Sequence, residues 1–244
     1  MCDQKPEAGA RVVCIVPAYN EAASIGRVVQ DVRTHVPGAD VLVIDDGSAD
    51  DTASVAATHG AQVCRLPFNL GIGAAVQTGL KFARRNSYDV AVQVDGDGQH
   101  DAAEIEKLIR PILQRQVDVV IGSRFMGKGG YRTPLLRRFG MRLFELLTWV
   151  TTGQHITDNT SGFRAYNANA ISFLAHRYPT HYPEAEAIVM LRRAGFRIQE
   201  VRTSMRPRQH GCSSIRAPKA VYYMLRVPLG ILVSAIRSVQ MSRR

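Results

Sequence analysis

Residues 90–100 read Val-Ala-Val-Gln-Val-Asp-Gly-Asp-Gly-Gln-His, an apolar run that ends in two carboxylates placed two positions apart. The run has the length and composition of a buried strand, and two glycines open the chain into a turn where Asp95 and Asp97 appear. Carboxylate oxygens, together with the amide of Gln99, are ligands that Mg²⁺ and Mn²⁺ prefer. An ordinary Asp-Gly turn between strands is the alternative, and this motif alone does not decide between the two.

Two further apolar runs end in polar residues in the same way. Residues 41–44 lead into Asp45-Asp46-Gly47-Ser48, and residues 12–16 lead into Pro17-Ala18-Tyr19-Asn20-Glu21. Fully apolar strands that alternate with helices predict a parallel sheet covered on both faces, and such sheets bind ligands beyond the carboxyl ends of their strands. The three polar clusters are therefore expected at one edge of one sheet, which favours a binding site over three unrelated turns.

The hydrophobic pattern extends this alternation along the chain. Strands are expected at residues 11–16, 41–45, 61–66, 89–95 and 117–121, and helices at about 21–35, 51–59, 74–86, 102–115, 134–151 and 184–194. Ser48 and Asp50 are predicted to cap the second helix. The glycine-rich loop 69–73 lacks the Lys-Ser/Thr of a P-loop, so it is either a phosphate cradle or a turn that lets the next helix pack closely on the sheet.

Length and composition predict a single α/β domain. A chain of 244 residues with 45% hydrophobic content can bury one sizeable core. We expect an N-terminal tail at 1–10, the folded domain at 11–215 and a basic and apolar helical segment at 216–244. The four cysteines show no CxxC spacing, which indicates free thiols in a reducing compartment, and the polar N-terminus predicts no signal peptide.

The net charge of +10 is distributed unevenly along the chain. Residues 1–110 contain 10 Lys and Arg against 15 Asp and Glu, a net charge of −5, whereas residues 111–244 contain 21 against 6, a net charge of +15. The basic half predicts an anionic partner. Because no zinc-finger, homeodomain or RNP signature is present, we expect phosphates and an anionic membrane surface, and no nucleic acid. The apolar helix expected at 134–151 carries Trp149 and three arginines, so it either packs in the core or lies on a membrane surface.

Six motifs follow one another along the chain. They are Pro-Ala-Tyr-Asn-Glu at 17–21, Val-Ile-Asp-Asp-Gly-Ser-Ala-Asp-Asp-Thr at 43–52, Asn-Leu-Gly at 69–71, Asp-Gly-Asp-Gly-Gln-His at 95–100, Gly-Ser-Arg at 122–124 and Ser-Gly-Phe-Arg at 161–164. In this order they resemble the motifs of family 2 glycosyltransferases, and the chain looks most like the dolichol- and polyprenyl-phosphate hexosyltransferases. The resemblance implies a GT-A fold, which is a Rossmann-like, mostly parallel sheet with helices on both faces. It also implies a nucleotide-sugar donor and inversion at the anomeric carbon.

The same resemblance implies roles for individual residues. Residues matching Asp95, Asp97 and Gln99 hold the metal, and arginines matching Arg124 and Arg208 bind phosphates. Asp97, Arg124 and Arg208 are accordingly the predicted catalytic residues. The predicted nucleotide-binding residues are Pro17, Tyr19, Glu21, Ile44, Asp46, Asp95, Gly96, Asp97 and Ser214. The last of these stands where such enzymes carry a phosphate-binding lysine, so one cation is missing from the late acceptor loop.

The expected reaction follows from charge. Cleavage of a sugar–nucleotide bond leaves a diphosphate, whose developing negative charge needs a countercharge from Mg²⁺ or Mn²⁺ and from Arg124. The Pro-, Gly- and Ser-rich segment 206–214 is expected to be mobile and to close Arg208 over the diphosphate. A lipid phosphate acceptor is already anionic, whereas a hydroxyl acceptor needs a carboxylate base, for which Asp158 and Glu186 are the candidates.

We therefore expect an enzyme that transfers a hexose from a GDP- or UDP-sugar to a polyprenyl or dolichyl phosphate. The alternative is a glycosyltransferase of the same fold that uses a saccharide or protein hydroxyl in cell-surface polysaccharide synthesis. A dehydrogenase is disfavoured because the turn after the first strand lacks G-x-G-x-x-G.

The predicted location is the cytoplasmic face of a membrane, with the enzyme bound peripherally. The apolar stretch Val227–Ile236 is shorter than the about 20 residues that span a bilayer, and a basic surface is attracted to anionic lipid. The expected partners are the nucleotide-sugar donor, the polyprenyl-phosphate acceptor, the anionic membrane surface and a small integral membrane protein.

Overall fold

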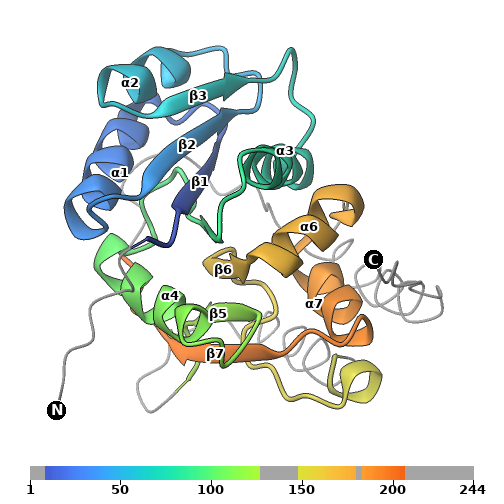
Figure 1. Cartoon of the computed structure of the whole chain (residues 1–244). Helices are drawn as coiled ribbons and strands as arrows, with labels where there is room; N and C mark the ends of the chain where they lie inside the picture. The colour runs from blue at the N-terminus through green and yellow to red at the C-terminus, as the bar shows by residue number, and fades with distance from the viewer. Residues whose placement is uncertain (1–8, 127–147, 180–182, 207–244) are drawn as a thin grey trace, which may run out of the picture.

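The apolar runs form a seven-stranded sheet in the order β3-β2-β1-β4-β6-β5-β7 (Figure 1). The computed structural model describes residues 9–126, 148–179 and 183–206. The strands are β1 (Val12–Ala18), β2 (Asp40–Asp45), β3 (Gln62–Arg65), β4 (Val90–Gln93), β5 (Val119–Ser123), β6 (Arg164–Asn167) and β7 (Ile198–Arg202).

Every strand of this sheet except β6 runs in the same direction. β1 pairs in parallel with β2 and β4, β2 pairs in parallel with β3, and β5 pairs in parallel with β7. β6 is antiparallel to β4 and β5, so Arg164 at its start lies opposite Gln93 of β4 and Ile121 of β5. The loops that follow the parallel strands therefore meet the loop that precedes β6 at one edge of the sheet.

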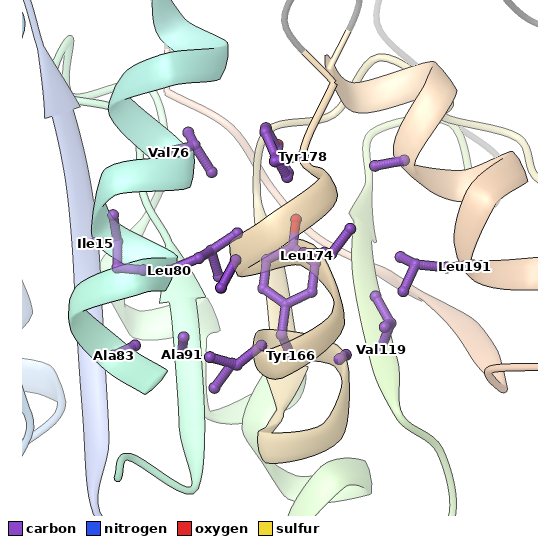
Figure 2. Close-up of a cluster of buried hydrophobic side chains, with 14 of the residues drawn as sticks. Ile15, Val76, Leu80, Ala83, Ala91, Val119, Tyr166, Leu174, Tyr178 and Leu191 are labelled. Carbon is purple, nitrogen blue, oxygen red and sulfur yellow. The ribbon is translucent and has the colours of Figure 1, made fainter. Parts of the chain in front are cut away.

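Helices cover both faces of the sheet (Figure 1). They are α1 (Ala22–His35), α2 (Thr52–Thr58), α3 (Ile72–Arg85), the 3₁₀ helix η1 (Ala102–Glu104), α4 (Ile105–Leu113), α6 (Ala168–Arg177) and α7 (Pro183–Arg193). One buried apolar layer joins α3, α6 and α7 to the sheet through residues such as Ile15, Leu80 and Leu174 (Figure 2). The other layer joins α1, α2 and α4 to Cys14 and Val16. Neighbouring residues of β1 thus face opposite layers, as the pleat of a strand requires.

Most of the expected elements are confirmed, with ends shifted by up to two residues. The sheet is mostly parallel, as the family resemblance implied, and β6 is antiparallel to its neighbours. The loop before β6 was expected only to enter a strand or a helix, and neither β7 nor α6 was expected. Both strands lack a continuous apolar run: β6 has only four residues, and β7, which lies at the edge of the sheet, reads Ile-Gln-Glu-Val-Arg. The helix expected at 102–115 is divided into η1 and α4.

The predicted caps of α2 are only half correct. Asp50 Oδ1 accepts the N–H of Thr52 at 3.1 Å, at the start of α2. Ser48 does not cap this helix, because its Oγ accepts the N–H of Asn20 at 2.9 Å and so ties together the loops after β1 and β2.

Cys14 and Cys64 are free thiols, as expected, and burial raises the pKa of the Cys14 thiol to about 12. The tail before residue 9, most of the helix expected at 134–151 and the segment 216–244 lie outside the described residues, so the domain limits stay predictions. Within the described ranges, no helix is long and apolar enough to cross a bilayer.

Candidate active site

The predicted polar clusters after β1, β2 and β4 meet at the carboxyl edge of the sheet. Pro17 lies opposite Ile44 in the β1–β2 ladder, and the N–H of Asp46 donates to the carbonyl oxygen of Ala18 at 2.9 Å. Tyr19 follows directly and has 46% of its surface exposed. The structure therefore brings these predicted nucleotide-binding residues together at one edge, while their role in binding stays a prediction.

Asn20 closes the loop after β1 onto the loop after β2. Its backbone adopts a φ of 54°, a left-handed conformation that asparagine tolerates better than most residues. Its side-chain Oδ1 accepts the N–H of Ala49 at 2.9 Å, and the N–H of Glu21 donates to Thr52 Oγ1 at 2.8 Å. These bonds fix where Tyr19 and Glu21 stand at the edge.

Asp46 holds the glycine-rich loop against the end of β2. Its Oδ1 accepts the N–H of Leu70 and its Oδ2 accepts the N–H of Gly71, both at 2.8 Å. Gly71, with a φ of 90°, then starts α3. The glycine-rich loop is thus a turn held by the buried carboxylate of Asp46. A contact of this loop with phosphate, and binding of the nucleotide by Asp46, stay predictions.

His100 supports the backbone of Asp95. The N–H of Asp95 donates to His100 Nδ1 at 3.0 Å, and His100 Nε2 lies 3.5 Å from Asp95 Oδ2. An imidazole that accepts at Nδ1 is neutral and carries its proton on Nε2. The ring also stacks on Phe163, with 4.7 Å between ring centroids, which joins the Asp95 loop to the loop before β6.

The pKa of His100 agrees with this neutral form. Burial is the main cause that lowers its pKa from 6.5 to about 4. The negative charges of Asp97 and Asp158 act in the opposite direction, and the positive charge of Arg124 lowers the pKa further. All three charged groups therefore lie near the imidazole.

Gly96 and Asp97 complete the loop after β4. Asp97 Oδ1 accepts the N–H of Gln99 at 3.0 Å. The hydroxyl of Ser24 lies 2.8 Å from both the carbonyl oxygen of Gly96 and Oε2 of Glu21. The structure thus brings Glu21, predicted to bind the nucleotide, up to the predicted metal loop.

The donor set suits a divalent cation that shares its coordination with a substrate. The side chain of Asp95 is 31% exposed and Asp97 is half-buried, so both carboxylates reach solvent. A Cβ on Gly162 would lie 2.9 Å from Asp95 Oδ1, so glycine leaves room for that carboxylate. No cluster of three His, Cys, Asp or Glu side chains exists among the described residues. Two carboxylates suffice where phosphate oxygens and water supply the remaining ligands, as is usual for Mg²⁺.

Arg124 follows β5 and is held by Asp158. Arg124 Nε donates to Asp158 Oδ2 at 2.7 Å, and its Nη2 donates to Asp158 Oδ1 at 2.8 Å and to Thr160 Oγ1 at 2.9 Å. The side chain of Asp158 is fully buried, whereas that of Arg124 is 20% exposed. Asp158 is therefore the counter-ion of Arg124, which does not favour its expected role as a general base.

Arg164 organises the loop before β6 and the start of α7. This fully buried guanidinium donates to the carbonyl oxygens of Ser161, Glu184 and Asn159 at 2.7, 2.8 and 3.2 Å. Burial raises the pKa of Glu184, and the charge of Arg164 opposes this rise. Glu186 lies in the first turn of α7, where a carboxylate complements the helix dipole.

Arg206 contacts the loop that contains Gln99, and the expected mobility of segment 206–214 stays a prediction because residues after Arg206 lie outside the described ranges. Its N–H donates to the carbonyl oxygen of Gln99 at 2.8 Å. Its guanidinium pairs with Asp31 of α1 at 2.6 Å and with Asp101 at 2.8 Å. Arg208 and Ser214 lie outside the described residues.

Several residues at this edge were missed as parts of the site. They are Ser24, His100, Thr160, Arg164 and Glu200, of which His100 and Arg164 stand inside motifs that the sequence already singled out. Their contacts join loops far apart in the chain, so local sequence patterns carried no signal for them.

The sheet and its carboxylate-rich edge define an α/β protein of the GT-A fold. The structure matches glucosyl-3-phosphoglycerate synthase from Mycobacterium tuberculosis in complex with UDP, with a TM-score of 0.73 and 22% identity, covering 96% of this chain and 83% of that one. The same enzyme matches in complexes that contain Mn²⁺ with UDP, at a TM-score of 0.71, and Mg²⁺ with UDP, at 0.68.

The chain belongs to glycosyltransferase family 2, because residues 13–174 match the family described as Glycosyl transferase family 2. It is 30% identical to UDP-N-acetylglucosamine–dolichyl-phosphate N-acetylglucosaminyltransferase of Methanococcus voltae, over 78% of this chain and 83% of that protein. It is 34% identical to undecaprenyl-phosphate mannosyltransferase of Micrococcus luteus, over 66% of this chain and 68% of that protein. The family resemblance read from the motifs is confirmed, and the protein is an enzyme of the hexosyltransferase class.

Proposed function

We propose that this enzyme transfers a hexose, with inversion, from a UDP- or GDP-sugar to a polyprenyl or dolichyl phosphate. The observation that carries the proposal is the Arg124–Asp158 pair, since the loop that contains Asp158 packs against the loop of Asp95 through Gly162 and Phe163. In this pair the guanidinium of Arg124 can bind a phosphate. The carboxylate of Asp158 is engaged by Arg124 and is therefore not available as a base. The two relatives whose names include a lipid phosphate support the same acceptor class.

The donor is assigned to the loops after β1, β2 and β4. In this proposal Pro17, Tyr19, Glu21, Ile44, Asp46 and Gly96 surround the nucleotide. Asp95, Asp97 and Gln99 hold Mg²⁺ or Mn²⁺, and that metal, when bound, neutralises charge on the departing diphosphate. The solved complexes of a protein with the same fold, which contain UDP with either ion, support the choice of metal.

The acceptor is assigned to the side of the edge where Arg124 lies. A phosphate monoester is anionic at neutral pH and already nucleophilic, so attack on the anomeric carbon needs no proton transfer to the enzyme. Arg124 would orient this phosphate, because a guanidinium donates to phosphate oxygens with fixed geometry. Arg208 is proposed to share this task, with Ser214 in place of the lysine of related enzymes.

Transfer to a hydroxyl is the second candidate, and one observation favours it. The pKa of Glu184 is raised, mainly by burial and with a further contribution from the charge of Asp95. A carboxylate with a raised pKa suits a general base. Glu186 is the other candidate for that role.

The acceptor class is tested with the purified full-length chain, a panel of UDP- and GDP-hexoses and Mn²⁺. Polyprenyl phosphate, polyprenol, 3-phosphoglycerate and an oligosaccharide are supplied separately as acceptors. We expect glycosylation of polyprenyl phosphate only, since polyprenol differs from it by the loss of the phosphate alone. Transfer to the oligosaccharide or to 3-phosphoglycerate, with polyprenyl phosphate unused, would contradict the proposal.

We also propose that the enzyme works at the anionic cytoplasmic surface of a membrane, with a small integral membrane protein as a further partner. The net charge of +15 in residues 111–244 and the exposed Trp149 and Val150 support this. Each basic residue close to an anionic surface contributes about 1 kcal/mol. Flotation with anionic vesicles is expected at low salt and should weaken at high salt and in Trp149→Ala. A protein that never floats would contradict the membrane part of the proposal.

A further inference from the structure

We propose that Asp158 and Glu200 are positioning residues that fix Arg124 for phosphate binding. Neither residue is proposed to touch a substrate. The inference rests on the proposed function in one respect, namely that a phosphate group of donor or acceptor lies against Arg124.

The first step is the contact between Asp158 and Arg124. Both carboxylate oxygens of Asp158 accept side-chain N–H groups of Arg124, and Oδ2 also accepts the backbone N–H of Arg124 at 3.1 Å. Main chain and side chain of the arginine are thus held by one carboxylate. Such a two-pronged pair fixes the plane of a guanidinium as well as its position.

The second step is the burial of this carboxylate. Asp158 is fully buried while Arg124 is 20% exposed, so the pair presents only its cationic end to solvent. A buried charge that loses its partner is strongly destabilising. Asp158 therefore holds the guanidinium of Arg124 in one position. Arg124 would then bind a phosphate through N–H groups of fixed direction more than through its net charge.

The third step is the placement of Asp158 by Glu200 of β7. Glu200 Oε1 accepts the N–H of Asp158 at 2.9 Å and the hydroxyl of Thr157 at 3.0 Å, and its Oε2 accepts the N–H of Thr157 at 2.8 Å. Because the Thr157 hydroxyl gives its proton to Glu200, the hydroxyl of Ser123, 2.8 Å away, donates to Thr157. One hydrogen-bonded chain thus runs from β7 through residues 157 and 158 to the end of β5, where Arg124 begins.

The ion pair between Asp118, which directly precedes β5, and Arg197, which directly precedes β7, provides a matched control at the opposite edge of the sheet. Asp118 accepts the N–H of Arg197 at 2.8 Å and lies 3.3 Å from its Nε, and it also accepts Asn167 Nδ2 at 2.9 Å. This pair joins the same two strands, but it stands at the edge where the strands begin. Its loss should lower stability without changing phosphate binding.

The experiment compares wild type with Arg124→Ala, Asp158→Asn, Glu200→Gln and Asp118→Asn in the full-length chain. Binding of inorganic pyrophosphate with Mn²⁺ is measured by calorimetry, and transfer to polyprenyl phosphate gives KM and kcat for the donor. We expect the first three variants to weaken pyrophosphate binding and to lower kcat/KM at least tenfold, while Asp118→Asn changes neither by more than about twofold.

The double variant Arg124→Ala with Asp158→Asn separates positioning from a general loss of stability. If Asp158 acts through Arg124, the second substitution adds less than a twofold loss to the first. Glu200→Gln keeps the test in force if Asp158→Asn does not fold. Any of three results would overturn the inference. They are unchanged pyrophosphate binding in Glu200→Gln, additive losses in the double variant, and no pyrophosphate binding by wild type. If pyrophosphate binding behaves as expected while polyprenyl phosphate is not glycosylated, the proposed function fails and the positioning role stands.

Discussion

The loops after β2 and β4 each place two carboxylates at the same edge of the sheet, yet they use them differently. After β2, Asp45 Oδ1 accepts the N–H of Ser48 at 3.0 Å and its Oδ2 lies 3.3 Å from Arg65 Nε, while Asp46 accepts two N–H groups of the glycine-rich loop. After β4, the side chain of Asp95 stays about one-third exposed.

The difference teaches that similar acidic motifs serve two purposes at one site. The carboxylates after β2 are buried and brace neighbouring backbone, so they shape the site from within. The carboxylates after β4 face solvent in part, where a cation and a diphosphate can reach them. Substitutions in the β2 loop should therefore lower stability, whereas substitutions in the β4 loop should lower activity.

Asp97→Asn should have the largest effect, because it removes the charge of a proposed metal ligand and leaves the fold intact. We expect transfer to fall at least 100-fold, about 2.7 kcal/mol of transition-state stabilisation. The measurement is turnover with saturating donor, beside Glu106→Gln on the exposed face of α4 as a control. Undiminished turnover by wild type in excess chelator would contradict the assignment of the loop to a metal.

Gly162→Ala should have the next largest effect. The added Cβ would lie 2.9 Å from Asp95 Oδ1 and 3.0 Å from Gln93 Nε2, so the carboxylate must move. We expect about a tenfold loss of turnover and a weaker apparent affinity for Mn²⁺, with about 1–3 kcal/mol of lost stability. Gly26→Ala is the control, because its new Cβ meets only the ring of the exposed His59, which can rotate away. We expect this control to keep normal activity. A wild-type affinity for Mn²⁺ in Gly162→Ala would show that the close approach of Gly162 to Asp95 is irrelevant.

Asp46→Ala should lower stability and nucleotide binding together. The part-buried N–H groups of Leu70 and Gly71 would lose their charged acceptor, which costs about 1–3 kcal/mol. Thermal unfolding and calorimetry with UDP and GDP give the two quantities. Weaker binding of the preferred nucleotide supports a place for Asp46 in the donor site, whereas unchanged nucleotide affinity at a lower Tm would reduce its role to bracing the loop.

The last expected effect, which concerns stability and not activity, is the dependence of stability on pH through His100. Its pKa is about 4 in the folded protein and near 6.5 when exposed, so between these values the unfolded chain binds more protons. The contribution of His100 to the free energy of unfolding should be complete above about pH 6.5. Below that pH the free energy of unfolding should fall toward pH 4, by at most about 1.4 kcal/mol per pH unit. Urea unfolding at several pH values in the presence of chelator measures this slope. His100→Asn should flatten it relative to the surface control His35→Asn, and an unchanged slope in His100→Asn would argue against the neutral, buried imidazole.

The sequence predicted the first five strands and the edge where their loops meet, because β1, β2 and β4 are apolar runs followed by polar residues. Asp95, Asp97 and Arg124 could be found in this way. The antiparallel β6 could not, since its four residues begin with a buried arginine whose N–H groups are satisfied by backbone carbonyl groups of the preceding loop and of the first turn of α7.

The sequence also left the role of each acidic residue open. Asp158 was a candidate base because a hydroxyl acceptor needs a carboxylate, and only the structure reveals Arg124 bound to both oxygens of Asp158. Glu200 carried no signal, because a single glutamate in an edge strand reads as a solvent-facing residue. These contacts join residues 34 to 43 positions apart, which no local pattern encodes.

The contrast between the two loops is tested most directly by Mn²⁺ binding in the presence of UDP or GDP, followed by electron paramagnetic resonance. Wild type, Asp97→Asn and Asp46→Asn are compared at equal saturation with nucleotide. We predict that Asp97→Asn loses the bound-Mn²⁺ signal, while Asp46→Asn keeps it once enough nucleotide is present. Retention of the signal in Asp97→Asn, or its loss in nucleotide-saturated Asp46→Asn, would contradict the division of roles between the β4 and β2 loops.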